Sequence, residues 1–301
     1  MNKDYIIKFI KDSWVAFRPF SLTLAIGSTS LGIIAAYRDN SMNLNSTGYN
    51  ILLIALITIA GLLAQSGANL VNDYFEGDFR YYRPSGRKIR FLGVERTYFD
   101  VYVFLWAMAC FAISALIGLL LIYLTDMRML LLGLVGIIGA YAYTGEPFVY
   151  KTKGLGVPFS FILMGPLMVL GAYFPFSNEL NLYPILLALP ASFIIPALMI
   201  SNEMRDFQRD EKLSLGTLSV RLGSKFSTIL YKSLIYGAYI LTVLFVITGL
   251  YPITSLLVFI TIPTAKKAVT AVSTFQKLGI PYTNALHWKF TLLLAITLLL
   301  G

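Results

Sequence analysis

The sequence is poor in the residues from which soluble proteins build cross-links and metal centres. Its 301 residues include one cysteine, Cys110, and one histidine, His287. A single cysteine excludes an internal disulfide and a cysteine-rich metal site, and a single histidine excludes a metal centre built from several histidines. We therefore predict that Cys110 and His287 are packing residues.

Charged residues are also scarce. Aspartate, glutamate, lysine and arginine make up 13% of the chain and hydrophobic residues 57%, whereas a soluble domain has about 25% charged residues. This composition excludes an ordinary soluble domain and predicts a protein embedded in a lipid bilayer. The net charge of +9 would indicate a nucleic-acid partner in a soluble protein, but membrane proteins collect Lys and Arg in cytoplasmic loops. We expect no nucleic acid and no obligate protein partner.

Apolar runs recur along the whole chain, and about 20 such residues cross a bilayer. They predict an all-α fold: one domain over residues 1–301, a polytopic membrane helical bundle of about nine transmembrane helices around a central cavity, with eight as the alternative count. Prolines within the runs, at 166, 190 and 196, favour kinks that open a cavity. The eighth span has a longer alternative that continues through Val272. The predicted spans are 20–37, 50–71, 101–124, 128–144, 157–175, 182–201, 228–249, 251–264 and 286–300.

Residues 1–19 differ from the rest of the chain and do not resemble a cleavable signal peptide. Basic residues alternate there with Ile6, Ile7, Ile10 and Trp14, which recur at helical spacing. Such a pattern is typical of an amphipathic helix that lies on the membrane surface. We predict an interfacial helix, with the start of span one as the alternative.

The loop charges indicate how the chain is oriented. The predicted loops after spans one and three hold one basic residue each, Arg38 and Arg128, and those after spans five and seven hold none. The N-terminus and the other loops hold nearly all the rest, and basic loops face the cytoplasm. We expect a multi-pass protein of the cell inner (cytoplasmic) membrane, with its N-terminus and the ends of spans two and six in the cytoplasm.

Two acidic motifs follow spans two and six. The second contains Asn202, Asp206 and Asp210, whose spacing places them on one face of a helix. The first runs from Asn72 to Asp78. Four crossings separate the motifs, and because this number is even, both motifs lie on the same side of the membrane. We interpret them as two halves of one site.

Acidic side chains at a membrane boundary either repel each other or hold hard cations. Mg²⁺ binds carboxylate and amide oxygens and bridges them to phosphate oxygens, whereas carboxylates alone repel a diphosphate. Basic residues lie beside both motifs, where they can contact the phosphate oxygens that the metal leaves free. The combination predicts a metal–diphosphate site. The alternative is that the bases only set the topology and contact lipid headgroups.

The motifs resemble those of a known family. Asn72-Asp73-x-x-Glu76 and Asn202-x-x-x-Asp206-x-x-x-Asp210 are similar to the paired acidic motifs of the UbiA-type membrane prenyltransferases. The resemblance covers most of the chain, and the run from Thr217 to Gly223 is most like the branch that prenylates 1,4-dihydroxy-2-naphthoate for menaquinone. Further matching stretches are Arg18-Pro19, Tyr143 to Pro147, Gly154 to Gly156, Gly165-Pro166, Gly171 to Tyr173 and Gly216 to Gly223.

The resemblance implies Mg²⁺-dependent transfer of a polyprenyl group from polyprenyl diphosphate to an aromatic acceptor, with release of diphosphate. It implies that the carboxylates of the two motifs are catalytic, namely Asp73, Glu76, Asp206 and Asp210. The implied metal ligands are Asn72, Asp73, Glu76, Asp78, Asn202, Asp206 and Asp210. The implied diphosphate contacts are Arg83, Arg87, Lys151 and Arg205. The chain has 19 tyrosines and 21 phenylalanines, whose ring faces can stabilise an allylic cation. Tyr141, Tyr143 and Tyr150 are expected to be structural.

The sequence departs from the family pattern at two positions of the first motif. Glu76 stands where aspartate is usual, and Arg80 stands where a further aspartate is usual, with Asp78 as the candidate replacement. These departures bear on the acceptor, so a hydroxybenzoate, a homogentisate-like ring, a porphyrin and glycerol phosphate stay open. Other classes also stay open: an ion-coupled transporter and a non-catalytic scaffold of the same fold. The Asp-x-x-Asp-Gly signature of phospholipid-alcohol phosphotransferases is absent from the sequence.

Overall fold

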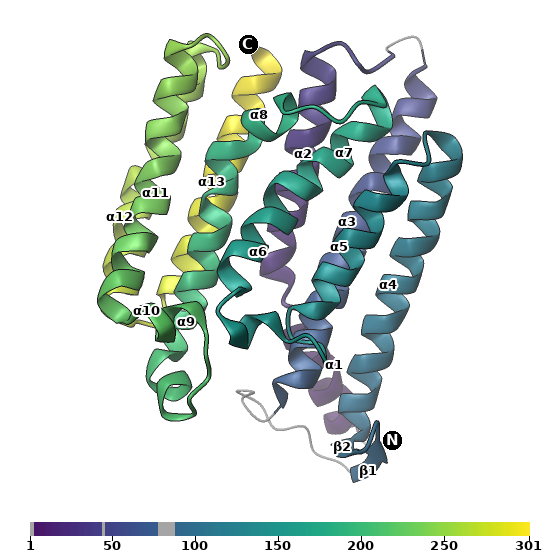
Figure 1. The fold of residues 1–301 in the computed structure, drawn as a ribbon, viewed down its shortest axis with the longest axis vertical. Coiled ribbons are helices and arrows are strands. Elements are labelled where there is room, and N and C mark those ends of the chain that lie inside the picture. The colour runs from purple at the N-terminus through teal and green to yellow at the C-terminus, as the bar shows by residue number, and fades with distance from the viewer. Residues whose placement is uncertain (1–2, 44–45, 78–87) are drawn as a thin grey trace.

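The computed structural model describes residues 3–43, 46–77 and 88–301 and forms a bundle of helices that run along its long axis (Figure 1). The predicted site residues Asp78, Arg83 and Arg87 lie outside these ranges. In chain order the elements, with η for short 3-10 or π turns, are α1 (Lys3–Phe17), η1 (Pro19–Ser21), α2 (Leu22–Arg38), α3 (Thr47–Phe75), β1 (Lys88–Phe91), β2 (Val94–Thr97), α4 (Tyr98–Leu124), α5 (Met129–Ala142), η3 (Tyr150–Lys153), α6 (Gly156–Ile162), η4 (Leu163–Leu167), α7 (Met168–Ser177), α8 (Tyr183–Ser192), α9 (Ile194–Lys212), α10 (Leu218–Leu222), α11 (Ser224–Ile247), η5 (Ile253–Thr261), α12 (Ile262–Ser273) and α13 (Gly279–Leu300).

Each predicted span coincides with a helical segment. Among the described residues, eight segments are long and apolar enough to cross a bilayer. The fourth predicted span, 128–144, corresponds to α5, whose 14 residues rise only about 21 Å, short of the roughly 30 Å of a hydrocarbon core. The predicted multi-pass helical bundle is therefore confirmed, with eight long segments and one short apolar helix. The eighth span follows the longer alternative, since α12 continues to Ser273.

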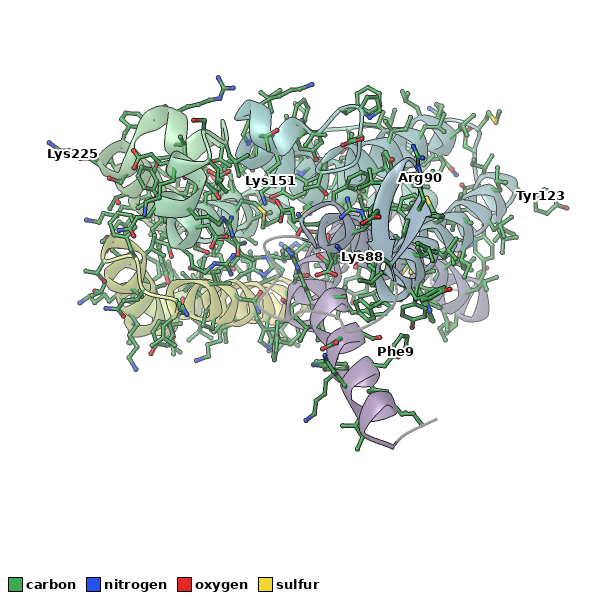
Figure 2. The ribbon with its side chains drawn as sticks, turned by 90° about the horizontal axis from the view of Figure 1, so that it is seen from below. Phe9, Lys88, Arg90, Tyr123, Lys151 and Lys225 are labelled. Atoms are coloured by element: carbon green, nitrogen blue, oxygen red, sulfur yellow. The ribbon has the colours of Figure 1, made fainter. Side chains whose placement is uncertain are left out.

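Helix α1 leaves the bundle to one side, as Figure 2 shows in the view along the bundle from below. Its inner face packs on α3 and α4 through Phe9, Ala16 and Phe17. Its outer face exposes apolar side chains, with Ile10 61% and Trp14 63% exposed. An apolar face turned away from the protein is typical of a helix that lies on the membrane surface, and the interfacial helix stays a prediction.

A two-stranded antiparallel hairpin, β1–β2, stands between α3 and α4 and was not expected from the sequence. Its turn, Leu92-Gly93, has positive φ at both residues, as two-residue hairpin turns require. Thr97 then caps α4 through a reciprocal pair of hydrogen bonds with Asp100. The Arg96 guanidinium lies 4.7 Å from the centre of the Tyr74 ring and so ties the hairpin to the end of α3.

Four clusters of buried hydrophobic residues hold the described part of the bundle together, and two of them are large. The larger is formed mainly by α2, α7, α8, α9, α11 and α13, and the smaller by α1, α3 and α4. Helices α2 and α7 approach so closely that a Cβ at Gly32 would lie 2.3 Å from the Val169 carbonyl oxygen. Small residues permit such contacts between membrane helices. Elements of both cores line the cavity described below.

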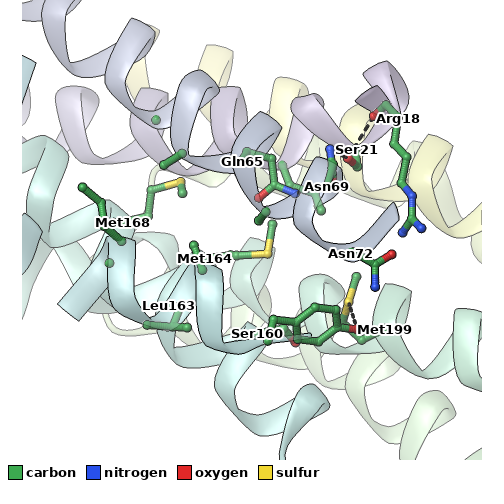
Figure 3. Close-up of a pocket in the computed structure, with 18 of the residues that line it drawn as sticks. Arg18, Ser21, Gln65, Asn69, Asn72, Ser160, Leu163, Met164, Met168 and Met199 are labelled. Atoms are coloured by element: carbon green, nitrogen blue, oxygen red, sulfur yellow. Dashed lines mark hydrogen bonds between the residues drawn. The ribbon is translucent and has the colours of Figure 1, made fainter. Parts of the chain in front are cut away.

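The segment from α6 to α7 is irregular at its centre. Pro166 lies in η4, a π-helical turn, because proline supplies no N–H to the α-helical ladder. The Ser28 hydroxyl donates a hydrogen bond to the Met164 carbonyl oxygen of this turn, 2.5 Å away. Leu163, Met164 and Met168 line the cavity from this segment (Figure 3). The irregularity expected at Pro166 thus borders the cavity.

Candidate active site

A cavity of about 1230 Å³ lies within the bundle, and both acidic motifs line it. Asn72, Asp73 and Glu76 come from the end of α3, and Asn202, Asp206 and Asp210 come from α9. We call the part of the cavity lined by these six residues its polar end. The even number of crossings predicted that both motifs lie at the same end of the bundle. In the structure they line the same cavity at that end.

The first motif closes α3. The Glu76 N–H donates to the Asn72 carbonyl oxygen at 3.0 Å, so the last helical turn carries Asn72, Asp73 and Glu76 together. Asn72 and Asp73 are only 2% and 5% exposed. Neither polar atom of the Asn72 amide makes a hydrogen bond, although the amide lies close enough to Glu76 to act on its charge. A buried amide without a partner inside a cavity is costly and points to a missing ligand.

The second motif lies on one continuous helix, α9. Asn202, Asp206 and Asp210 face the cavity at the predicted four-residue spacing. Arg205 forms a bidentate pair with Asp206, at 2.7 and 2.5 Å. Arg209 bridges both carboxylates, at 3.1 Å from Asp206 and 2.6 Å from Asp210. The two aspartates of this motif, Asp206 and Asp210, are therefore each paired with a base on the same helix.

The loop between α5 and α6 brings a third chain segment to the polar end. Its backbone folds back on itself, because the Lys151 N–H donates to the Tyr143 carbonyl oxygen at 3.0 Å. Positive φ angles at Val149 and Gly154 flank η3 and turn the chain on either side of it. The Lys151 side chain lies inside the end of the bundle, unlike Lys225 at its rim (Figure 2).

Lys151 connects the two acidic motifs. Its ammonium group forms an ion pair with the Glu76 carboxylate. It also interacts electrostatically with Asp206 and Asp210 on α9. The polar end thus alternates acids and bases from three separate segments of the chain.

Glu76 stays ionised at neutral pH. Burial raises the pKa of its carboxyl, but the charges of Lys151 and Arg18, together with the hydrogen bond from Lys151 and the nearby polar Asn72 amide, outweigh burial and hold the pKa below its ordinary value of 4.5. The carboxylate is therefore available as an anionic oxygen ligand.

Arg18 belongs to a stretch that matched the family, Arg18-Pro19, but the sequence did not assign it to this site. It lies between α1 and α2 with left-handed backbone angles, φ 49 and ψ 59, which cost a non-glycine residue energy and cluster at functional sites. Asn69 holds the turn by donating to the Phe17 carbonyl oxygen at 2.9 Å and to the Ser21 hydroxyl at 2.8 Å. Figure 3 shows the Arg18 side chain directed towards Asn72.

Glu203 is the second unexpected residue in the cavity lining. It is 4% exposed and accepts a hydrogen bond from the Ser219 N–H at 2.8 Å. Because this N–H belongs to the first turn of α10, Glu203 joins α10 to α9. The sequence analysis did not identify Glu203, because it lies between Asn202 and Asp206 and does not share their four-residue spacing.

The remaining sequence predictions concern single residues. Cys110 is buried in the smaller core, and His287 is 1% exposed between α13 and α2, 3.5 Å from the Thr291 hydroxyl. Both side chains are buried between helices, as expected of packing residues. Of the tyrosines expected to be structural, Tyr141 donates to the Glu146 carbonyl oxygen and Tyr150 to the Gly139 carbonyl oxygen of α5, whereas Tyr143 donates to Met199 Sδ on α9.

The polar end offers hard oxygen donors, the kind that Mg²⁺ prefers. Among the described residues, no three Asp, Glu, His or Cys side chains converge as a ready metal cage, since Lys151, Arg205 and Arg209 neutralise the acids. The unpartnered Asn72 amide and the carboxylates around it nevertheless fit a cation that shares its coordination with a polyanionic substrate. The donor set therefore suits a metal bound together with a diphosphate better than one bound by protein alone.

The bundle and its cavity, lined by acids and bases at one end, define a polytopic membrane protein with an internal polar site. The sequence profile of the UbiA prenyltransferase family matches residues 25–271. The chain belongs to the UbiA prenyltransferase family and is an enzyme, so the resemblance drawn from the motifs is confirmed. The 1,4-dihydroxy-2-naphthoate octaprenyltransferase of Bacillus subtilis (strain 168) is 29% identical over 280 residues, which cover 92% of this chain and 86% of that relative.

Two solved structures share the fold. A digeranylgeranylglyceryl phosphate synthase has a TM-score of 0.63 at 16% identity, covering 98% of this chain and 100% of that one. A UbiA homologue from Archaeoglobus fulgidus, bound to GPP and Mg²⁺, has a TM-score of 0.58 at 13% identity, covering 96% of this chain and 99% of that one. These likenesses establish the bundle architecture.

Proposed function

We propose that this protein transfers a polyprenyl group from polyprenyl diphosphate to 1,4-dihydroxy-2-naphthoate, a step of menaquinone biosynthesis, and that it requires Mg²⁺. One observation carries the proposal: two acidic motifs and Lys151 meet at the polar end of a cavity that continues between apolar helices. Such a cavity suits an amphiphile with a polyanionic head and a hydrocarbon tail. The naphthoate acceptor is proposed from the Bacillus subtilis relative.

The two motifs would hold the metal. The ligands proposed on α3 are Asn72, Asp73 and Glu76, and those on α9 are Asn202, Asp206 and Asp210; Asp78 is proposed as a further ligand. When bound, Mg²⁺ would neutralise charge on the diphosphate and make it a better leaving group. Lys151, Arg205 and Arg209 pair with these carboxylates in the structure. If the carboxylates held a metal ion, these bases would be free to contact the diphosphate oxygens.

The basic side chains would stabilise the leaving group. Lys151, Arg205 and Arg18 lie within the cavity lining, where they can donate hydrogen bonds to diphosphate oxygens as the bond to the prenyl carbon breaks. Arg83 and Arg87 are proposed as further contacts. An arginine guanidinium can donate two hydrogen bonds to two phosphate oxygens at once, whereas the lysine ammonium is a single charge on a flexible side chain.

The interior beyond the polar end would protect the reacting carbon. Cleavage leaves that carbon with positive charge, and water in its place would hydrolyse the donor. Tyr143 lines the cavity near Lys151, whose ammonium lies 5.8 Å from the centre of the Tyr143 ring. Burial raises the pKa of the Tyr143 hydroxyl far above its ordinary value, so the ring stays neutral and offers its face rather than a phenolate.

The orientation is also a proposal. The basic loops support an inner-membrane protein with the polar end and the N-terminus in the cytoplasm. In that orientation a water-soluble aromatic acceptor reaches the polar end directly, while the donor enters from the lipid.

The experiment is transfer by the purified protein in detergent or liposomes. Labelled octaprenyl diphosphate would be incubated with 1,4-dihydroxy-2-naphthoate, a hydroxybenzoate and a homogentisate, with and without EDTA, and the product identified by mass. We expect a prenylated naphthoate that EDTA abolishes. Prenylation of another ring would refute the acceptor, and transfer that persists in EDTA would refute the metal.

The site assignment has its own comparison. Asp73→Ala and Asp206→Ala should abolish transfer in protein that still purifies as a single species. Glu211→Gln is the matched control, because Glu211 is exposed on α9 beside Asp210. Normal turnover by either alanine variant would contradict the assignment. Substrate flux across liposomes with no prenylated product would favour the transporter alternative.

A further inference from the structure

The cavity continues far beyond its polar end along one face of α3. Its lining residues there recur every three or four positions, at Ile57, Ala60, Ala64, Ala68, Asn72 and Glu76, which is the spacing of a single helical stripe. From Ile57 to Glu76 the stripe measures about 28 Å at roughly 1.5 Å per residue. It changes along its length from carboxylate and amide to small alkyl side chains. The stripe is therefore polar at one end and apolar along the rest, which matches a diphosphate with a long hydrocarbon tail.

Glycines on α4 and α5 form the opposite wall of this apolar part. Gly118 on α4 and Gly133 and Gly136 on α5 all line the cavity, and a Cβ at any of them would meet no atom within 4 Å. The next glycine of α5 behaves differently, because a Cβ at Gly139 would lie 2.6 Å from Leu163. Gly139 thus closes a helix contact, whereas the other three leave open space. We call Gly118, Gly133 and Gly136 the glycine wall.

The glycine wall spans a range of depths. Helix α5 ends beside Tyr143, so Gly136 lies about 10 Å and Gly133 about 15 Å from Tyr143 along the helix. The Ser114 hydroxyl donates to the Ala60 carbonyl oxygen at 3.0 Å, which fixes the register of α4 on α3. By that register Gly118 lies about 26 Å from the level of Asp73. A side chain at Gly136 would therefore obstruct the cavity nearer the polar end than a side chain at Gly133.

We propose that the glycine wall accommodates the far isoprene units of the polyprenyl donor and sets the chain length that the enzyme accepts. This inference rests on the proposed function and concerns the same cavity. An isoprenoid carries a methyl branch on every unit, so it is wider than a straight acyl chain and uses the room that missing Cβ atoms leave. Glycine is among the poorest helix formers, and three of them facing empty space contribute nothing to helix packing.

The test is a series of leucine substitutions measured with donors of increasing length. Gly136→Leu, Gly133→Leu and Gly118→Leu would each be assayed with geranyl, farnesyl, geranylgeranyl and octaprenyl diphosphate, and kcat/KM compared with wild type. We expect the loss with octaprenyl diphosphate to be about 10–200-fold, the range for a misfit in an apolar pocket, with geranyl diphosphate retained. The longest donor still accepted should be shorter for Gly136→Leu than for Gly133→Leu.

The controls separate shape from folding. Gly48→Leu is matched, because Gly48 is a helical glycine of α3 with open space around it but outside the cavity lining; it should leave the donor preference unchanged. Gly136→Ala adds one methyl group and favours the helix, so it should fold where Gly136→Leu fails and still shift the preference towards short donors.

Three outcomes would overturn the inference. If the ratio of octaprenyl to geranyl turnover is unchanged in both Gly136 variants, the tail lies elsewhere, and the proposed function still stands. If kcat/KM of the folded variants falls equally for all donors, the glycines support the structure of the site and do not determine the chain length that is accepted. If wild-type protein transfers no prenyl group from any donor, the proposed function fails first, and that result is distinct from the other two.

Discussion

Lys151 donates a hydrogen bond to the Glu76 carboxylate and thereby links the loop between α5 and α6 to the end of α3. The two residues are far apart in the sequence and come from segments that otherwise meet little at this end. Because Lys151 also acts on Asp206 and Asp210, it occupies the place between the motifs that a diphosphate would need. We therefore interpret Lys151 as the cation that links the two motifs and that would pair with the diphosphate of the substrate.

Replacing this lysine should impair catalysis strongly. Lys151→Met keeps the length of the side chain and removes its charge, so we expect kcat to fall by about 10²–10³-fold, the usual effect of losing one donor to a developing anion. Steady-state kinetics with polyprenyl diphosphate would measure this. Lys153→Met is the control: Lys153 is exposed on the same loop and should leave kcat unchanged. A kcat within twofold of wild type for Lys151→Met would contradict the assignment.

The same ion pair should make stability depend on pH. The folded-state pKa of Glu76 lies below 4.5, so its contribution to stability is fully present above that pH and is lost as pH falls through the lowered value. Glu76→Gln leaves Lys151 without its partner and should lower the unfolding free energy by about 1–3 kcal/mol at pH 7. Thermal unfolding in detergent would be followed from pH 7 to pH 3. The difference from wild type should shrink towards pH 3, and a difference that grows instead would reverse the interpretation.

The bundle could be predicted from the sequence because its signals are local. Each apolar run is long enough to be recognised alone, and the spacing of Asn202, Asp206 and Asp210 fixes their shared face on α9. The meeting of the two motifs followed from counting crossings. The short hairpin β1–β2 escaped prediction, because four-residue strands rich in Lys and Arg show little of the alternation that marks a strand.

The rest of the site depends on contacts between distant segments, which composition and spacing do not reveal. Arg18 enters the cavity only because a left-handed turn directs it there, and Glu203 lines it while anchoring α10. The pairing of Lys151 with Glu76 depends on how a loop folds back over Tyr143. The change from polar to apolar side chains along α3 can be read from the sequence. That glycines of α4 and α5 face this stripe could be recognised only from the structure.

Asn69 should act on catalysis through Arg18. Its amide fixes the turn that carries Arg18 by two hydrogen bonds, so Asn69→Ala frees the turn and we expect KM for the donor to rise about tenfold, or about 1.4 kcal/mol. The readout is a double-mutant cycle with Arg18→Met. If Asn69 works by positioning Arg18, the second substitution should add little to the first. Fully additive effects would show that Asn69 contacts the substrate independently.

Asn72 permits a test that separates binding from folding. Its buried amide makes no hydrogen bond within the described part of the chain, so Asn72→Leu removes an unsatisfied polar group and should leave the melting temperature unchanged or raise it. The Mg²⁺ concentration needed for half-maximal transfer should rise by about 10–100-fold, as it does when a group that tunes a metal site is lost.

Asn50 provides the opposite case for that test. It is buried on the same helix, and its amide donates to the Asn43 carbonyl oxygen at 2.8 Å, so Asn50→Leu should lower the melting temperature and leave the Mg²⁺ requirement unchanged. The two variants therefore predict crossed results: one changes the metal dependence without loss of stability, and the other loses stability without a change in metal dependence. If Asn72→Leu instead destabilises the protein and leaves the Mg²⁺ requirement as it was, Asn72 is a structural residue, and the metal must be held by the carboxylates alone.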